Sequence, residues 1–465
     1  MTFVPPENDA TKDAPTRAEG YGLHDAQIEA VDRALELQDT ETVQAVAADL
    51  HAADLADLIE ALTPDDRHEF VQSLGHEVDP EALSYLVPPV REQVIEDIGP
   101  RGLATALSKL ESDDAVEIFE DLDSEFRQRI LTQLPEAYRL ILEEAITFPE
   151  ESAGRLMQRE VVAIPMTWTV GQTIDFMRSA VDLPEDFYDL FVVDPKHKPQ
   201  GLVPLSRVLR ARRPTPITEV MDSDMRVVPF NMNQEEVAYL FRQYGLVSAP
   251  VVDDANRVIG MITVDDIVHV IDEEAEDDLM KLGGVGESDL YGRLLETARS
   301  RATWLVVNLG TAVLASLVIG LFEATLQQAV ALAVLMPIVA SMGGNAGTQT
   351  LTVAVRALAM KELTPANTMR FIGKELTVGL VNGAVFALLV GVVAIVWFGR
   401  MDIAVILGVA MIVNLVVAGL SGTLIPIGLA KLRIDPAVAS AVFLTTITDI
   451  VGFFAFLGLA AAFIL

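Results

Sequence analysis

Long stretches without a charged residue fill most of the chain after residue 301 and limit what this part can fold into. Each stretch exceeds the roughly 20 residues that an α-helix needs to cross a bilayer. The last stretch is interrupted only by Asp449. The stretches predict membrane helices at about residues 302–322, 327–355, 374–399, 403–430 and 436–464. We therefore expect a five-helix membrane domain at residues 301–465.

The charges in the loops predict the orientation of this domain. One set of loops carries the basic residues Arg293, Arg299, Arg301, Arg356, Lys361, Arg370, Lys374, Lys431 and Arg433. The opposite loops carry only Glu323, Arg400 and Asp402. Basic loops stay on the cytoplasmic side. We expect a multi-pass protein of the cytoplasmic membrane, with the first 300 residues in the cytoplasm and Leu465 outside.

The rest of the chain is acidic. The net charge is −34, and only six of the 67 acidic residues lie after residue 300. A nucleic-acid partner needs a basic surface, so the net charge argues against this class of function. The acidity favours a cation partner, with simple solubility as the alternative. The absence of cysteine excludes disulfides and thiolate metal sites.

The soluble part begins with a polar segment, residues 1–22, that we expect to be disordered. Residues 23–150 then show short helical patterns with start signals. Thr63 is placed to cap a helix that opens with Pro64. Similar units follow one another, which predicts an α-solenoid.

Residues 151–214 and 215–272 contain an internal duplication. Phe191-Val192-Val193-Asp194 matches Pro250-Val251-Val252-Asp253, and the first copy has an extra loop at residues 181–186. The sequence pattern of each copy predicts a strand, a helix, two strands around a turn and a second helix. This α/β arrangement resembles a tandem pair of CBS domains, modules that often bind adenosine ligands or metal ions. An adenine nucleotide is therefore a candidate ligand, although the resemblance does not identify it.

An acidic helix connects this pair to the membrane domain, in the segment 265–300. Its residues 265–282 are amphipathic and end at Gly283 and Gly284. Its carboxylates are dense enough to repel one another, so a bound cation would help the helix form. A solvated acidic face is the alternative.

The second predicted membrane helix contains Pro337, Gly343, Gly344 and Gly347. These residues predict a broken helix whose freed carbonyl groups line a wet cavity. The alternative is close helix packing through small residues.

Asp449 lies near mid-depth of the last predicted helix, and Asn345 lies at a similar depth in the second. A carboxylate at the centre of a membrane helix costs about 2.5 to 3.5 kcal/mol and usually marks an ion path. Interhelical hydrogen bonding beside Thr445, Thr446 and Thr448 is the alternative. The candidate ligands are hard oxygens, which suit partly hydrated Mg²⁺. One Asp per chain suggests a two-fold pore.

Two motifs are similar to signatures of the MgtE family of magnesium transporters and channels. They are Pro337-Ile338-Val339-Ala340-Ser341-Met342-Gly343-Gly344-Asn345-Ala346-Gly347-Thr348-Gln349 and Thr445-Thr446-Ile447-Thr448-Asp449-Ile450-Val451-Gly452-Phe453. The order of helical domain, CBS pair, acidic helix and five spans also matches. The resemblance implies a homodimeric Mg²⁺ pore in the bilayer. Its pore residues would be Asp449, Asn345, Gly343, Gly344 and Thr445.

The resemblance also implies a cytoplasmic sensor in which Mg²⁺ bridges carboxylates and holds the pore shut. The matching positions are Asp113, Asp114, Glu117, Asp266, Asp272, Glu274, Asp277 and Asp278. Two departures stand out. Ala441 stands eight residues before Asp449, where some members have an Asn, so we expect no direct role for this position in the pore. His269 stands where an acid is typical on the connecting helix, which predicts a weakened or retuned sensor.

The sequence therefore predicts a Mg²⁺ transporter or channel that internal Mg²⁺ closes. One alternative is a channel for Co²⁺ or Mn²⁺. Another is a membrane-anchored CBS sensor that conducts nothing. No recognisable set of nucleophile, base and orienting group is present in the sequence, so we do not expect an enzyme.

Overall fold

The computed structural model describes residues 22–75, 78–180, 183–184, 187–285 and 294–464. The segment expected to be disordered, 1–22, lies outside the described residues except for Gly22. The extra loop at 181–186 is described only at Leu183 and Pro184. The chain forms two compact units, Met1–Ile271 and Asp272–Leu465, and each is described by itself.

Short helices make up the first part of the N-terminal unit. They are α1 (Asp25–Glu36), α2 (Thr40–Ala48), α3 (Ala52–Ala61), α4 (Pro64–Leu74), α5 (Ala82–Tyr85), α6 (Pro88–Leu107), α7 (Ser112–Glu120), α8 (Ser124–Leu131) and α9 (Glu136–Ala145). Many helices pack on the helix two positions along the chain, such as α2 on α4 and α5 on α7. This stacking of neighbouring units is the arrangement of the expected α-solenoid.

The local start signals act as expected. The Thr63 hydroxyl accepts a hydrogen bond from the Asp66 backbone N–H, and Pro64 occupies the first position of α4. Proline is suited to that position because its missing N–H would have no partner there. Helix α6 bends at Gly99, whose φ is 67°, and Pro100 follows it. Phe70 and Phe119 lie fully buried in the shared apolar core.

The duplicated region forms two small sheets of the same topology. Their elements are α10 (Ala153–Leu156), β1 (Ala163–Pro165), α11 (Val170–Ser179), β2 (Asp189–Val193), β3 (Pro199–Pro204), α12 (Leu205–Arg210), the 3-10 helix η2 (Ile217–Glu219), β4 (Val228–Pro229), α13 (Gln234–Tyr244), β5 (Ser248–Val252) and β6 (Val258–Thr263). In each sheet the central strand pairs parallel with the first strand and antiparallel with the third. The predicted order of elements along the chain, a strand, a helix, two strands and a helix, is confirmed in both copies.

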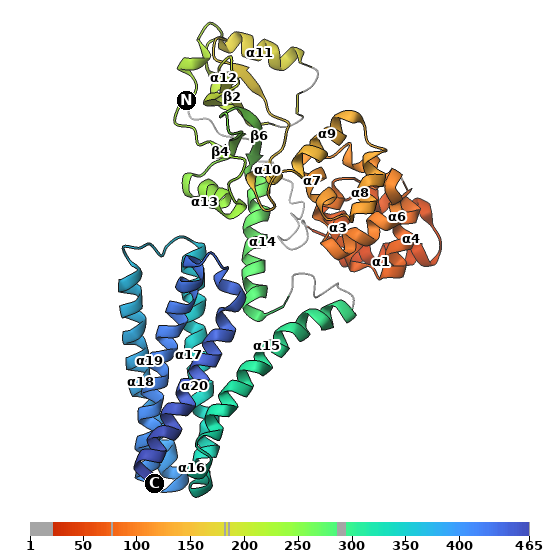
Figure 1. Cartoon of the computed structure of the whole chain (residues 1–465). Coiled ribbons are helices and arrows are strands. Elements are labelled where there is room, and N and C mark those ends of the chain that lie inside the picture. The colour runs from red at the N-terminus through yellow and green to blue at the C-terminus, as the bar shows by residue number, and fades with distance from the viewer. Residues whose placement is uncertain (1–21, 76–77, 181–182, 185–186, 286–293, 465) are drawn as a thin grey trace, which may run out of the picture. The chain divides into compact units, whose positions relative to one another are not determined.

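Helix α14 (Val264–Gly283) follows β6 directly as one continuous helix (Figure 1). It ends where the sequence predicted, because Gly284 has a φ of 66° that glycine adopts readily. Ile267 and Val270 bury its apolar side in the core of the second repeat.

The second unit contains the long apolar helices. They are α15 (Leu294–Gly320), α17 (Val330–Ala359), α18 (Thr368–Phe398), α19 (Met401–Lys431) and α20 (Pro436–Ile464), with the short α16 (Glu323–Gln328) before α17. Five helices among the described residues are long and apolar enough to cross a membrane. Helix α19 is the most buried of them and packs against α17, α18 and α20.

The predicted break in the second membrane helix is wrong. Helix α17 runs without interruption through Pro337 and the glycines. Proline removes one backbone hydrogen bond, whereas a full break would leave several polar groups without partners in lipid. Gly343 and Gly347 instead allow close approach of other side chains. The alternative of small-residue packing is therefore correct for these two positions.

Candidate functional site

Helices α17 and α20 approach each other directly at Gly347 and, through the Asn414 side chain of α19, at Gly343. A Cβ atom on Gly347 of α17 would lie 2.7 Å from Cδ1 of Leu444 in α20. One turn earlier in α17, Gly343 lies against the Asn414 side chain, which also lies against Gly452 of α20. Later residues of α17 thus meet earlier residues of α20. The two helices therefore run antiparallel.

This antiparallel register places the two candidate pore residues at the same level. Asn345 lies midway between the glycines that make the two contacts, and Asp449 lies between Leu444 and Gly452. The expectation that both residues have a similar depth agrees with this register. Asn345 is exposed on the single chain and Asp449 is partly exposed. Neither side chain is enclosed within its own bundle.

A line of exposed polar side chains follows one side of α17. Ser341, Asn345, Thr348 and Thr352 recur at helical spacing and are exposed. Asn345 donates from Nδ2 to the Ser341 hydroxyl at 3.3 Å, and Thr348 donates to the Gly344 carbonyl at 2.9 Å. A polar surface of this kind is unfavourable against lipid tails. It is suited to water or to another protein surface.

The threonines near Asp449 satisfy their hydroxyl groups within α20. Thr445 donates to the Ala441 carbonyl at 3.1 Å, and Thr448 donates to the Leu444 carbonyl at 3.0 Å. Thr446 bonds in the same way to Val442. Interhelical hydrogen bonding through these donors is therefore not what the structure shows. Each hydroxyl oxygen keeps acceptor capacity for another group.

The two central glycines of α17 differ in their surroundings. Gly343 is buried, and a Cβ atom there would lie 2.2 Å from Nδ2 of Asn414. Gly344 has no neighbouring group within 4 Å of such a Cβ atom among the described residues. Gly343 thus serves helix packing, and Gly344 lies on the open side.

Acidic side chains gather between the helical domain and the second repeat in the N-terminal unit. Asp113 is buried, and its carboxylate oxygens have no hydrogen-bond partner among the described residues. Burial, with Asp266 and Asp114 nearby, raises its pKa. Burial and neighbouring carboxylates also raise the pKa of Glu111 and of Asp114 to about 7 each. Burial raises that of Asp266 to about 6.

Glu117, a candidate sensor position, and His269, the residue that replaces a typical acid, each contact an identified side chain. Glu117 accepts a hydrogen bond from Arg91 at 2.6 Å, and Arg91 also pairs with Asp121. The His269 ring contacts the Tyr85 ring edge to face, with centroids 6.1 Å apart. Glu117 is therefore already balanced by an arginine, whereas no basic side chain in the described part of the chain pairs with Asp113 or Asp114.

The remaining sensor candidates lie on α14 in the second unit. Asp272 is exposed, while Glu274, Asp277 and Asp278 are partly buried. Lys281 donates to Asp277 and, at 2.8 Å, to Asp435 at the start of α20. Burial lowers the pKa of Lys281, but these carboxylate bonds raise it overall. Burial, with Asp435 and Asp277 nearby, raises the pKa of Asp278 to about 6.

Among the described residues, no group of three or more His, Asp or Glu side chains is arranged to hold a metal ion. The carboxylates of the acidic clusters lie near one another, but they do not converge on one point as metal ligands would. Mg²⁺ commonly uses one or two carboxylates and several waters, so it does not require a closed cage of side chains.

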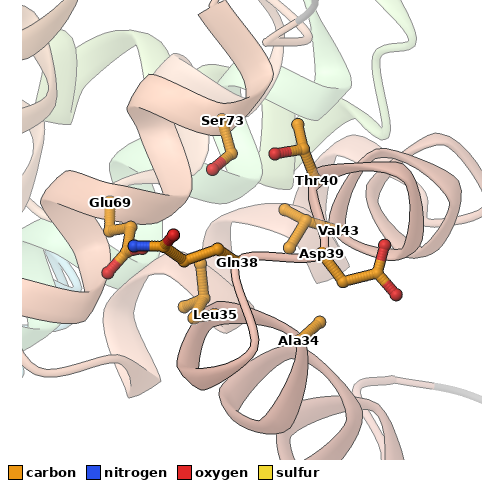
Figure 2. Close-up of a pocket in the computed structure, with 8 residues that line it drawn as sticks. All are labelled: Ala34, Leu35, Gln38, Asp39, Thr40, Val43, Glu69 and Ser73. Atoms are coloured by element: carbon orange, nitrogen blue, oxygen red, sulfur yellow. The ribbon is translucent and has the colours of Figure 1, made fainter.

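Two cavities lie in the N-terminal unit. One, of about 330 Å³, lies between the first helices, and Figure 2 shows its eight lining residues, among them Asp39 and Glu69. The other, of about 370 Å³, lies between the two repeats and is lined by Arg159, Val161, Val162, Ala163, Phe176, Leu183, His197, Val258 and Ile259. The second cavity combines apolar walls with basic side chains.

Sequence reasoning missed several residues at these sites. Glu375 is buried in α18 and accepts a hydrogen bond from Thr350 of α17 at 3.0 Å. Glu111 joins the cluster at Asp113, and Lys281 and Asp435 join the cluster on α14. Asn414 is the only amide side chain in the uncharged stretch 403–430, and this isolated polar residue was the sequence signal that could have pointed to it.

These features define a membrane protein with five long apolar helices among the described residues, a line of exposed polar side chains on α17 and an acidic unit that contains two repeats of one α/β fold. Family models match the chain in this order: the MgtE intracellular N domain at 50–151, CBS domains at 153–213 and 217–273, and the MgtE divalent cation transporter at 336–459.

Known proteins match across most of the chain. The magnesium transporter MgtE of Thermus thermophilus is 31% identical over 434 residues, which cover 92% of this chain and 96% of that protein. The magnesium transporter MgtE of Enterococcus faecalis is 34% identical over 322 residues, which cover 69% and 71%. A solved cytosolic domain of the Mg²⁺ channel MgtE in complex with ATP is 30% identical, with a TM-score of 0.49, and the match covers 52% of this chain and 99% of that one. The chain belongs to the MgtE family of divalent cation transporters.

Proposed function

We propose that this protein carries Mg²⁺ across the cytoplasmic membrane along a path that Asp449 and Asn345 line. The observation that carries the proposal is the level shared by these two residues on antiparallel helices, with both side chains open to the outside of the single chain. Exposure of Asp449 to lipid would cost about 2.5 to 3.5 kcal/mol. A water-filled path removes most of this cost.

The ligand chemistry supports Mg²⁺ as the cargo. Asp449, Asn345 and Thr445 offer side-chain oxygen atoms near this level. All six histidines precede the first membrane helix, and the chain has no cysteine. Hard oxygen ligands favour Mg²⁺ over softer metals. Relatives named as magnesium transporters support the same cargo.

We also propose that two copies form the path. The exposed polar line on α17 needs a polar neighbour, and a second copy related by a two-fold axis would supply an equivalent line and a second Asp449. Two carboxylates then face one hydrated divalent ion. In this arrangement the N-terminal unit lies in the cytoplasm and α20 ends outside, in line with the basic loops. No enzymatic reaction is assigned to the chain.

Regulation is proposed to act through the acidic clusters. Cations bound at Asp113, Asp114, Glu117 and Asp266, or at Asp272, Glu274, Asp277 and Asp278, would relieve repulsion in the compact arrangement. The raised pKa values of Asp114 and Asp266 show how strongly burial disfavours their charged form. Mg²⁺ that binds the compact closed state preferentially shifts the population toward closure.

The cavity between the repeats is a proposed site for an adenine nucleotide. Its apolar wall at Val162 and Phe176 suits a base, and Arg159 and His197 suit phosphate groups. ATP titration of the full-length protein tests this site. We expect His197→Asn, which suits the φ of 62° at this position, to weaken binding about fivefold. His68→Asn, on the remote helix α4, is the matched control. Equal affinity in both variants would reject the site.

Uptake into proteoliposomes tests the cargo. Mg²⁺ entry is followed with an internal indicator dye, while Co²⁺ or Mn²⁺ is added outside at equal concentration. We expect saturable Mg²⁺ entry that these ions reduce by less than about half. Nearly complete inhibition by either ion would instead identify that ion as the preferred cargo. Absence of wild-type entry would favour a non-conducting sensor.

A further inference from the structure

Asn414 of α19 is a fully buried amide at the point where α17, α19 and α20 meet. Its Nδ2 donates to the Val339 carbonyl of α17 at 2.8 Å. Its Oδ1 is buried and has no hydrogen-bond partner among the residues that the structure describes. The side chain is therefore fixed by one directional bond to α17.

Two glycines make the space that the amide occupies. A Cβ atom on Gly343 of α17 would lie 2.2 Å from Nδ2 of Asn414, and a Cβ atom on Gly452 of α20 would lie 2.8 Å from the same nitrogen. Real Cβ atoms do not approach other atoms this closely. Gly343, Asn414 and Gly452 thus form one packed set across three helices.

This packed set is close to both residues of the proposed path. Gly343 lies two residues before Asn345, and Gly452 lies three residues after Asp449. A slide or rotation of α17 against α20 would break the bond from Asn414 to Val339 or drive the amide into a glycine backbone. The amide therefore determines how the two helices are aligned.

Stability alone does not account for an amide at this place. A buried polar atom without a partner destabilises the fold, and an apolar side chain of similar shape avoids that penalty. A directional hydrogen bond, in contrast, specifies one register among several that apolar packing would tolerate. The choice of Asn over Leu thus indicates a requirement for alignment.

We propose that Asn414 is a positioning residue that sets the register of α17 against α20 and so the distance between Asn345 and Asp449. The inference rests on the proposed ion path through these two residues. It assigns Gly343 and Gly452 to the accommodation of the Asn414 amide. Asn414 itself does not contact the ion.

The first test replaces the amide with an apolar group of similar shape. Asn414→Leu is expected to remain folded, with thermal stability equal to or above that of the wild type. Its half-saturating Mg²⁺ concentration should rise at least about threefold, and its preference for Mg²⁺ over Co²⁺ should fall. Asn382→Leu, at an exposed position of α18, is the control. Unchanged half-saturation and ion preference in a stable Asn414→Leu protein would overturn the proposal.

The second test asks whether the glycine and the amide depend on each other. Gly343→Ala should lower thermal stability and Mg²⁺ uptake, because its Cβ collides with Asn414. The double variant Gly343→Ala/Asn414→Ala should recover stability relative to Gly343→Ala. No recovery would contradict the packing relation. Asp449→Asn is measured in parallel: wild-type uptake by that variant would reject the ion path, whereas the stability cycle would still test the packing of Asn414.

Discussion

The Nζ atom of Lys281 lies 2.8 Å from Oδ2 of Asp435. This ion pair joins the end of α14 to the start of α20. Lys281 also pairs with Asp277, and its neighbour Leu282 packs on the apolar cluster formed by Leu351, Val355, Ala437 and Leu444. The chain thus provides its own cation at the acidic end of the connecting helix. Part of the charge that Mg²⁺ would balance is already balanced here.

Removal of this internal cation should make closure depend more on Mg²⁺. In Lys281→Met, Asp277, Asp278 and Asp435 repel one another without a nearby ammonium group. We expect more Mg²⁺ flux at low internal Mg²⁺ and a steeper loss of flux as internal Mg²⁺ rises. Flux measurements on proteoliposomes with varied Mg²⁺ on the side of the N-terminal unit test this, with Lys374→Met as the control. Identical curves for Lys281→Met and the wild type would refute the role of Lys281.

The cluster at Asp113 should make stability depend on pH and Mg²⁺. The folded-state pKa values of Glu111 and Asp114 are raised to about 7 and that of Asp266 to about 6, so the native state holds more protons than the unfolded state above about pH 4. The free energy of folding that these bound protons contribute is fully present below about pH 4 and is lost as the pH rises through about 6 to 7. We therefore expect the melting temperature in EDTA to fall between about pH 5.5 and pH 8.

Mg²⁺ should restore this loss mainly at the higher pH, where the carboxylates are charged and protons no longer compete. Asp113→Asn removes one buried charge. It should raise the melting temperature in EDTA at about pH 8 and reduce the additional stabilisation by Mg²⁺. Thermal unfolding of the full-length protein measures both effects. If Mg²⁺ raised the melting temperature equally at about pH 5.5 and at about pH 8, this would argue against a regulatory cation at this cluster.

The two glycines on either side of Asn345 should respond differently to a methyl group. Gly347→Ala crowds Leu444, so overpacking of about 1 to 3 kcal/mol opposes the gain in helix propensity, and we expect lower stability. Gly344→Ala meets open space and should be neutral or stabilising by about 1 kcal/mol. Because Gly344 lies on the proposed path, its variant should nevertheless lower Mg²⁺ flux. A Gly344→Ala protein with full flux would place Gly344 outside the path.

The elements of this fold with local signals could be predicted from the sequence. Uncharged length predicted the membrane helices, Thr63 and Pro64 predicted the start of α4, and Gly284 predicted the end of α14. The duplicated Val-Val-Asp turns predicted the paired strands. Each of these features depends on neighbouring residues or on simple length, which a sequence displays directly.

Contacts between distant segments could not be predicted in the same way. Lys281 and Asp435 are 154 residues apart, and Asn414 meets Gly343 and Gly452 only after three helices pack. The break in α17 was wrongly predicted for the same reason, because Gly343 and the Asn414 side chain that packs on it are far apart in the sequence. Glycines that loosen a helix and glycines that admit a neighbouring side chain look alike in the sequence, and only the position of Asn414 distinguishes them.

If Mg²⁺ passes the carboxylate of Asp449, loss of this charge should stop Mg²⁺ flux, which is measured for Asp449→Asn in proteoliposomes at low internal Mg²⁺. Asp402→Asn, at the exposed start of α19, is the matched control for loss of one carboxylate in the membrane domain. We expect Asp449→Asn to lose at least about 90% of the flux and Asp402→Asn to keep most of it. Wild-type flux in a folded Asp449→Asn protein would show that Mg²⁺ does not pass this carboxylate.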